Sequence, residues 1–225
     1  MKHIKRFLIV PAVLVLLTVC AAAAALGILR IRTDAILDDY SSIYTDQRYR
    51  LPLMIEDVEV IRQEISCGYA VIEMFSSWNG DPITEQTLFD RYGKVVTSTG
   101  RAFCAEMNRL FPAYSTVMHR FLKNTELIGL VYDDLAAGIP VPVEWAAVCG
   151  DQWTLHYSLV IGADIPADRI TVANPYGYLE EITVAEFLDR TSFEAFEDMP
   201  LFLRLGFAFG VFEKNTVFSV RKNAS

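Results

Sequence analysis

The chain has 225 residues, of which 52% are hydrophobic, and a formal net charge of −8. This length allows one domain of ordinary size with a short appendage, and it supplies enough apolar residues for a core. The first 32 residues hold five basic and no acidic side chains, and the remainder holds 15 basic and 28 acidic ones, so a nucleic-acid partner is disfavoured by charge repulsion.

The N-terminal segment has the composition of a targeting element. Lys2, Lys5 and Arg6 precede an uncharged apolar run over residues 7–29, which is long enough to span a bilayer. Small residues at 21–25 also suit signal-peptide cleavage. Residues 1–32 are therefore predicted to be a signal peptide or a single transmembrane anchor, with a buried core helix as the alternative. The rest of the chain is expected outside the cytoplasm, membrane-anchored or secreted.

Residues 33–57 are polar and tyrosine-rich, and we expect a stalk there, with the domain proper over 58–225. The four cysteines form no C-x-x-C pair, which gives little support to a structural zinc site. Neither a metal nor another cofactor is predicted.

The first half of the domain reads as helical. Apolar residues after Cys67 fall on one helical face, Ser66 stands at the N-cap position, and residues 79–82 end the helix. Three more helices are predicted over residues 85–92, 102–110 and 125–138.

The second half reads as strands, over residues 140–147, 155–161 and 170–173, followed by a helix that Thr183 and Glu186 begin as a capping box. The apolar tail over residues 201–220 is predicted to add strands. Helices followed by strands indicate an α+β domain with the helices on one side of the sheet.

Cys67 is the first candidate for chemistry. At the first turn of a helix, unpaired N–H groups and the helix dipole stabilise a thiolate, so we expect a lowered thiol pKa and the most reactive thiol of the domain. A buried structural cysteine is the alternative.

His156 and Asn174 can complete a catalytic group. His156 lies on a strand in the other half of the domain, and Asn174 ends the next strand. A histidine facing a helix N-terminus can activate a thiol, and an asparagine oxygen can orient the imidazole. A satisfied core histidine and a turn asparagine are the alternatives, while His119 is expected on the surface.

Three stretches together resemble the double-glycine, bacteriocin-leader peptidases, which are papain-like enzymes, and their single-domain relatives. The stretches are 63–70 (QEISCGYA), 155–162 (LHYSLVIG) and 170–177 (ITVANPYG). The resemblance implies a papain-like fold, with an N-terminal helical half and a C-terminal antiparallel sheet, over about residues 58–190. It also implies cysteine peptidase activity through Cys67, His156 and Asn174 on a peptide or leader segment.

The chain departs from the family pattern in two places. Asn174 stands where the family usually has Asp, although papain itself uses Asn. Gln63, the counterpart of the oxyanion-binding glutamine, is four rather than about six residues before Cys67. Asn174→Asp is therefore expected to be tolerated better than Asn174→Ala.

Three other functions fit the same residues. One is a non-catalytic peptide-binding relative, and another is an acyl or peptidyl transferase on the same fold. The third is a secreted structural domain in which Cys104 pairs with Cys149 and Cys67 is inert.

Overall fold

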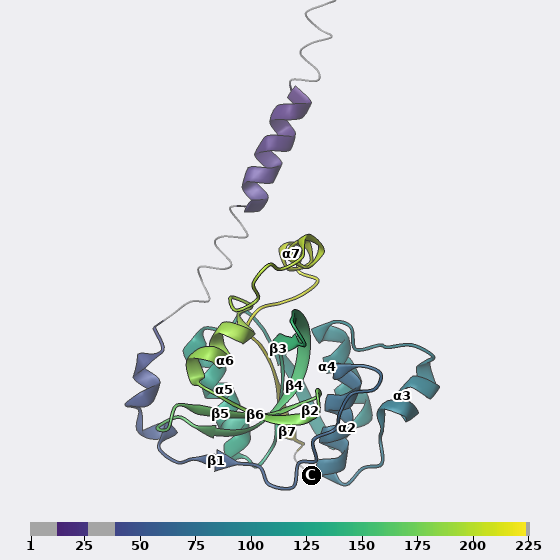
Figure 1. The fold of residues 1–225 in the computed structure, drawn as a ribbon, viewed down its shortest axis with the longest axis vertical. Helices are drawn as coiled ribbons and strands as arrows, with labels where there is room; N and C mark the ends of the chain where they lie inside the picture. The colour runs from purple at the N-terminus through teal and green to yellow at the C-terminus, as the bar shows by residue number, and fades with distance from the viewer. Residues whose placement is uncertain (1–12, 27–38, 224–225) are drawn as a thin grey trace, which may run out of the picture. The chain divides into compact units, whose positions relative to one another are not determined.

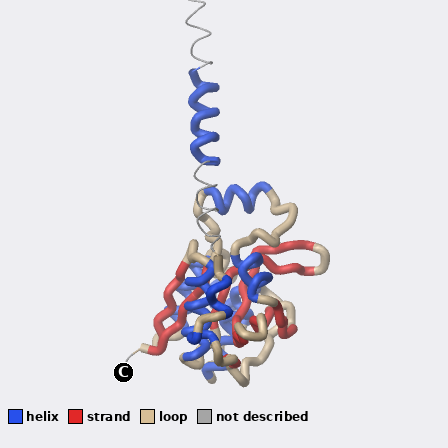
Figure 2. Tube along the Cα trace, turned by 90° about the vertical axis from the view of Figure 1, so that its left-hand side faces the viewer, coloured by secondary structure: helices blue, strands red, loops and turns tan. Residues whose placement is uncertain are grey.

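The computed structural model describes residues 13–26 and 39–223. These belong to two compact units, and the boundary between the units along the chain falls between Leu37 and Asp38. In the first unit, the part of the apolar run over residues 13–26 forms a helix (Figure 2). None of the described helices reaches the length and apolarity that a bilayer crossing requires. The basic residues on both sides of the run lie outside the described residues.

The second unit is built on one antiparallel sheet of seven strands (Figure 1). Its order is β2-β7-β3-β4-β5-β6, and the short β1 pairs with the far end of β4. The strands are β1 (Leu53–Met54), β2 (Tyr114–His119), β3 (Val141–Cys149), β4 (Gln152–Asp164), β5 (Arg169–Asn174), β6 (Tyr178–Ile182) and β7 (Thr216–Lys222).

Helices cover both faces of this sheet. The helices are η1 (Ser41–Tyr44), η2 (Gln47–Tyr49), α2 (Cys67–Asn79), α3 (Glu85–Tyr92), α4 (Gly100–Leu110), α5 (Asn124–Ala136), α6 (Val184–Thr191) and α7 (Leu201–Ala208). α2, α3 and α4 share one core with alternate β4 residues, while α5 and α6 share a second core with the opposite face (Figure 1). The α+β class is confirmed, but the expectation of helices on one side is wrong, because the central strands are apolar on both faces.

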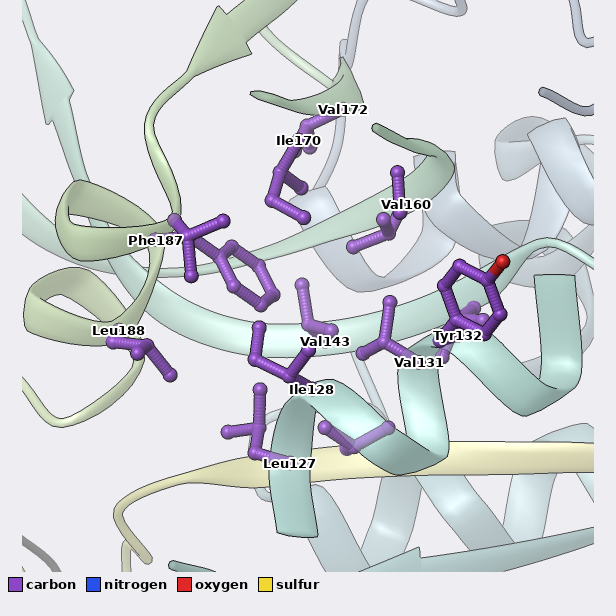
Figure 3. Close-up of a cluster of buried hydrophobic side chains, with 14 of the residues drawn as sticks. Leu127, Ile128, Val131, Tyr132, Val143, Val160, Ile170, Val172, Phe187 and Leu188 are labelled. Atoms are coloured by element: carbon purple, nitrogen blue, oxygen red, sulfur yellow. The ribbon is translucent and has the colours of Figure 1, made fainter. Parts of the chain in front are cut away.

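The core beneath α5 shows how tightly this second face is packed. Figure 3 places Leu127, Ile128 and Val131 of α5 against valine and isoleucine side chains of the sheet, with Phe187 and Leu188 of α6 alongside. All of these side chains are at most 2% exposed. The sheet is thereby held in one position relative to the helices, which fixes the strand ends that carry the candidate residues.

Capping residues set the helix ends where the sequence predicts them. Ser66 Oγ accepts the Tyr69 N–H at 3.2 Å and begins α2, and Gly80 ends α2 in the left-handed region at φ 80°. Thr84 and Gly93 begin and end α3 in the same way.

The tertiary structure differs from the sequence-based expectations in several segments, and residues 178–182, with no expected element, form β6. Residues 201–208, expected as strand, form α7, because Leu203 and Phe207 are one turn apart and bury one helical face. Residues 114–119, with no expected element, form β2. In place of a free stalk, residues 39–57 pack on the domain: Ile43 and Tyr49 are at most 5% exposed.

Candidate active site

The loop before α2 is held by a carboxylate from the neighbouring helix. Glu85, at the start of α3 and 4% exposed, accepts the backbone N–H groups of Glu64, Ile65 and Ser66 at 2.9–3.0 Å. Three successive N–H groups bound to one buried carboxylate fix the backbone of this loop. The Cys67 side chain at the first turn of α2 is therefore rigidly placed.

Cys67 lies at an open edge of the sheet. β5 pairs with β4 only from Leu159 onward, so residues 152–157 of β4 pair with β3 alone within the described sheet. The N-terminus of α2 approaches this edge, where the backbone N–H groups of Tyr157 and Gly68 favour the Cys67 thiolate. The thiol therefore lies beside the residue that follows His156.

His156 and Asn174 are in direct contact. His156 Nε2 and Asn174 Oδ1 are 3.0 Å apart, and both residues are at most 2% exposed. Asn174 Oδ1 also accepts the Tyr176 N–H at 3.0 Å, while its Nδ2 donates to Glu180 Oε2 at 2.8 Å. These two bonds fix the amide orientation, so Oδ1 must accept from a protonated Nε2. In the neutral imidazole, Nδ1 is then the atom free to accept a proton.

The ion pair between Arg190 and Glu180 holds Asn174 through its amide nitrogen. Arg190 of α6, 4% exposed, donates to Glu180 Oε1 at 2.6 Å and to the Ala146 carbonyl at 2.9 Å. Its guanidinium also lies 3.7 Å from the ring centroid of Trp145. The chain of contacts from Arg190 through Glu180 and Asn174 holds the imidazole in one orientation.

Tyr176 covers one face of the imidazole. Its ring is stacked on His156 with centroids 4.2 Å apart and planes 20° apart. The Tyr176 hydroxyl is 2.8 Å from Thr154 Oγ1, which fixes the ring in this position. The stacked tyrosine shields the His156–Asn174 hydrogen bond from water on that side.

Burial favours the neutral forms of both Cys67 and His156. Burial raises the pKa of the Cys67 thiol, and the N–H groups of Tyr157 and Gly68 only partly oppose this shift. Burial likewise lowers the pKa of His156 to about 4, against the hydrogen bond that its Nε2 donates to Asn174 Oδ1. The expectation of a lowered thiol pKa is therefore wrong, because desolvation outweighs the helix N-terminus.

Gln63 lies close to the same group of residues. Its backbone N–H donates to the Pro175 carbonyl at 2.7 Å, which joins the loop before Cys67 to the loop after Asn174. Its side-chain oxygen is buried and has no hydrogen-bond partner among the described residues. The Gln63 side chain therefore lies near the site, and its oxygen is not held by a hydrogen bond to any described residue.

The remaining cysteines are apart from one another. Cys104 Sγ donates to the Thr116 carbonyl at 3.4 Å, and Cys149 is exposed at the end of β3. All four cysteines are free thiols, so the pairing of Cys104 with Cys149 is not present. Within residues 13–26 and 39–223, no group of three or more His, Cys, Asp or Glu side chains could hold a metal ion.

Sequence reasoning missed the residues that support His156. Tyr176 lies within the stretch 170–177, but its stacking on His156 depends on the turn at Gly177. Glu180 could have been found, because the hairpin pairs it with Val172, which lies on the same strand face as Asn174. The partner Arg190 carries no such local signal, since it comes from a separate helix.

Comparison with known proteins identifies the family and a solved structure with a similar fold. A model of the Peptidase_C39 like family matches residues 55–199, whereas no curated protein matches the chain. The chain is similar to a solved structure of "a double glycine motif protease from AMS/PCAT transporter in complex with the leader peptide". The two share 12% identity and a TM-score of 0.50, over 77% of this chain and 99% of that one. The family model spans most of the domain, including the segments of Cys67, His156 and Asn174, and the chain belongs to the Peptidase_C39 like family.

Proposed function

We propose that this protein is a cysteine peptidase in which Cys67 is the nucleophile, His156 the general acid and base, and Asn174 the residue that orients His156. The hydrogen bond between His156 Nε2 and Asn174 Oδ1 is the observation that carries this proposal. It leaves Nδ1 as the proton acceptor, on a strand whose next residue contacts the Cys67 thiol.

The reaction begins from a neutral thiol and a neutral imidazole. His156 Nδ1 takes the thiol proton while Cys67 Sγ attacks the peptide carbonyl carbon. The backbone N–H of Cys67, with Gln63 as the candidate side-chain donor, stabilises the oxyanion; one such donor contributes about 3 kcal/mol. The imidazolium then gives its proton to the leaving amine, and a thioester is formed.

Water completes the cycle. His156 Nδ1 removes a proton from a water molecule while the water oxygen attacks the thioester carbonyl carbon. The imidazolium then returns this proton to Cys67 Sγ as the carbon–sulfur bond breaks, which releases the acid product and regenerates the thiol. Because the imidazole must be neutral to start, the rate should fall as the pH drops through about 4, where His156 takes up a proton.

A peptide or leader segment is the proposed substrate. The similar solved structure was obtained with a leader peptide, which supports peptide binding on this fold. The proposed location is outside the cytoplasm, directed by residues 1–32, and digestion of the domain by protease added to intact cells would test it.

The activity is tested on the full chain with a complex peptide mixture and identification of new termini by mass spectrometry. Cys67→Ala and His156→Ala should each lower cleavage about a thousandfold or more. Cys104→Ala is the matched control, because Cys104 lies on α4, away from His156, and should leave cleavage unchanged.

Two results would oppose the proposal. Cleavage that survives Cys67→Ala would assign the activity to another group or a contaminant. Binding of peptides by the parent chain without any cleavage would favour the non-catalytic relative.

A further inference from the structure

A pocket adjoins the histidine side of the candidate site. It has a volume of about 570 Å³ and is walled by the β3–β4 hairpin, the loop before α2 and the turn after Asn174. Arg62, Cys149, Tyr176 and Tyr178 are among its lining residues. The mechanism above uses none of these four side chains as a reacting group.

Tyr176 connects this pocket to the reaction centre. Its ring is one wall of the pocket and also stacks on His156 at 4.2 Å. Burial raises the pKa of the Tyr176 hydroxyl to about 12, and the charges of Cys149 and Cys67 add to this shift. Since His156 must protonate the leaving amine, the part of the substrate that follows the cleaved bond departs on this side.

Arg62 gives the pocket a positive charge. Its Cβ, Cγ and Cδ would lie 3.0–3.4 Å from a side-chain carbon at position 177, where Gly177 has φ +94°. The glycine thus makes room for the arginine stem, which orients the guanidinium. Arg62 is exposed and forms no ion pair within the described part of the chain.

Glu180, whose side chain is 18% exposed, does not neutralise this charge. Glu180 is bound on one oxygen by Arg190 at 2.6 Å and on the other by Asn174 at 2.8 Å. The acidic body repels acidic peptides only weakly beyond about 10 Å in ordinary salt. Arg62 is the charged side chain among the described residues that line this pocket. A second pocket, which Arg62 also adjoins, is lined by the acidic residues Glu64, Glu73 and Glu85.

We infer that this pocket binds an acidic side chain located shortly after the cleaved bond, with Arg62 as the residue that determines this specificity. The aromatic rings of Tyr176 and Tyr178 would pack against the rest of that segment. The inference rests on the proposed peptidase function and adds a substrate class to it.

The test uses two internally quenched peptides that differ only in Glu or Gln at the first or second position after a cleavage site found in the peptide mixture. The full chain should cleave the Glu peptide about two- to fivefold more efficiently, mainly through a lower KM, as expected for a surface ion pair. Arg62→Gln should abolish the difference, and Arg62→Lys should retain most of it. Arg50→Gln is the control, because Arg50 is an exposed arginine that does not line the pocket.

A second measurement does not need turnover. In the Cys67→Ala chain, the Glu peptide should slow alkylation of Cys149, which lines the pocket, more than the Gln peptide does. Arg62→Gln should remove this difference as well.

The outcomes separate the two proposals. Cleavage without a Glu preference, or a preference that Arg62→Gln leaves intact, overturns the assignment of this pocket while the peptidase function stands. Absence of any Cys67-dependent cleavage overturns the peptidase function, on which the pocket assignment rests. Where cleavage is present, equal protection of Cys149 by both peptides overturns the pocket assignment alone.

Discussion

The side chain of Asn174 accepts hydrogen bonds at its oxygen and donates one at its nitrogen, and this determines which substitutions the position tolerates. Its oxygen faces His156, whereas its amide nitrogen donates to Glu180 Oε2 at 2.8 Å. Asn174→Asp would place a second carboxylate against Glu180 at a fully buried position, which opposes ionisation of both groups. The expectation from the sequence that Asp is tolerated better than Ala is therefore replaced by the expectation that both substitutions are costly.

We expect Asn174→Ala and Asn174→Asp each to lower kcat/KM by roughly a hundredfold, at the low end of what general acid–base catalysis contributes. Adding Glu180→Gln to Asn174→Asp should restore much of the activity, because a glutamine amide can donate to the new carboxylate. Cleavage of a quenched peptide by the three variants measures this. Full activity of Asn174→Asp alone would mean that the Glu180 contact does not matter.

Two helical glycines have different surroundings, and this gives a prediction at the scale of the element. A side-chain carbon on Gly68 would lie 2.4 Å from Thr97 Oγ1 and 2.8 Å from Thr97 Cβ, next to Cys67 on α2. A carbon on Gly129 of α5 would meet the guanidinium of Arg48 at 3.3 Å and the hydroxyl of Tyr49 at 3.4 Å, which are the ends of two long side chains.

Gly68→Ala should destabilise the domain by about 1–3 kcal/mol through overpacking and lower peptide cleavage by moving the first turn of α2. Gly129→Ala should be neutral or stabilise by up to about 1 kcal/mol, because alanine favours helix. Urea unfolding and peptide cleavage measure both effects. Equal stability of the two variants would show that Thr97 moves aside at no cost.

A buried acid links the whole molecule's stability to pH. Glu144 on β3 is fully buried, and both of its oxygens lack hydrogen-bond partners within the described residues. Burial, with a smaller effect from Glu213, raises the pKa of Glu144 to about 8. The folded state thus binds this proton more tightly than the unfolded state does, so stability falls as the pH rises from about 4.5 to about 8.

Glu144→Gln should raise the free energy of unfolding at pH 8 by on the order of 1–3 kcal/mol, with little change at pH 5. Urea unfolding at the two pH values measures the difference. Glu181→Gln is the control, because the Glu181 side chain is 57% exposed and should show no such dependence. An equal gain at both pH values would contradict the assignment to ionisation.

Much of the fold and part of the site could be predicted because their signals are local. Ser66 and Gly80 set the ends of α2 through contacts within one turn, and the alternation over residues 155–161 identified β4. The ordered stretches around Cys67, His156 and Asn174 indicate the family from the sequence alone, and the family model confirms it. Placement outside the cytoplasm by residues 1–32 stays a prediction.

Other properties were decided by tertiary contacts between distant segments. The residues of α7 are apolar almost throughout, so their pattern fits strand or helix, and the segment forms a helix (Figures 1 and 2). Burial of Leu203 and Phe207 in one cluster with Ala146 selects the helix. The protonation state of Cys67 is likewise decided by tertiary contacts. A helix N-terminus stabilises a thiolate through local N–H groups. Desolvation of the Cys67 thiol depends instead on all the residues that pack around it, and these come together only when the chain folds.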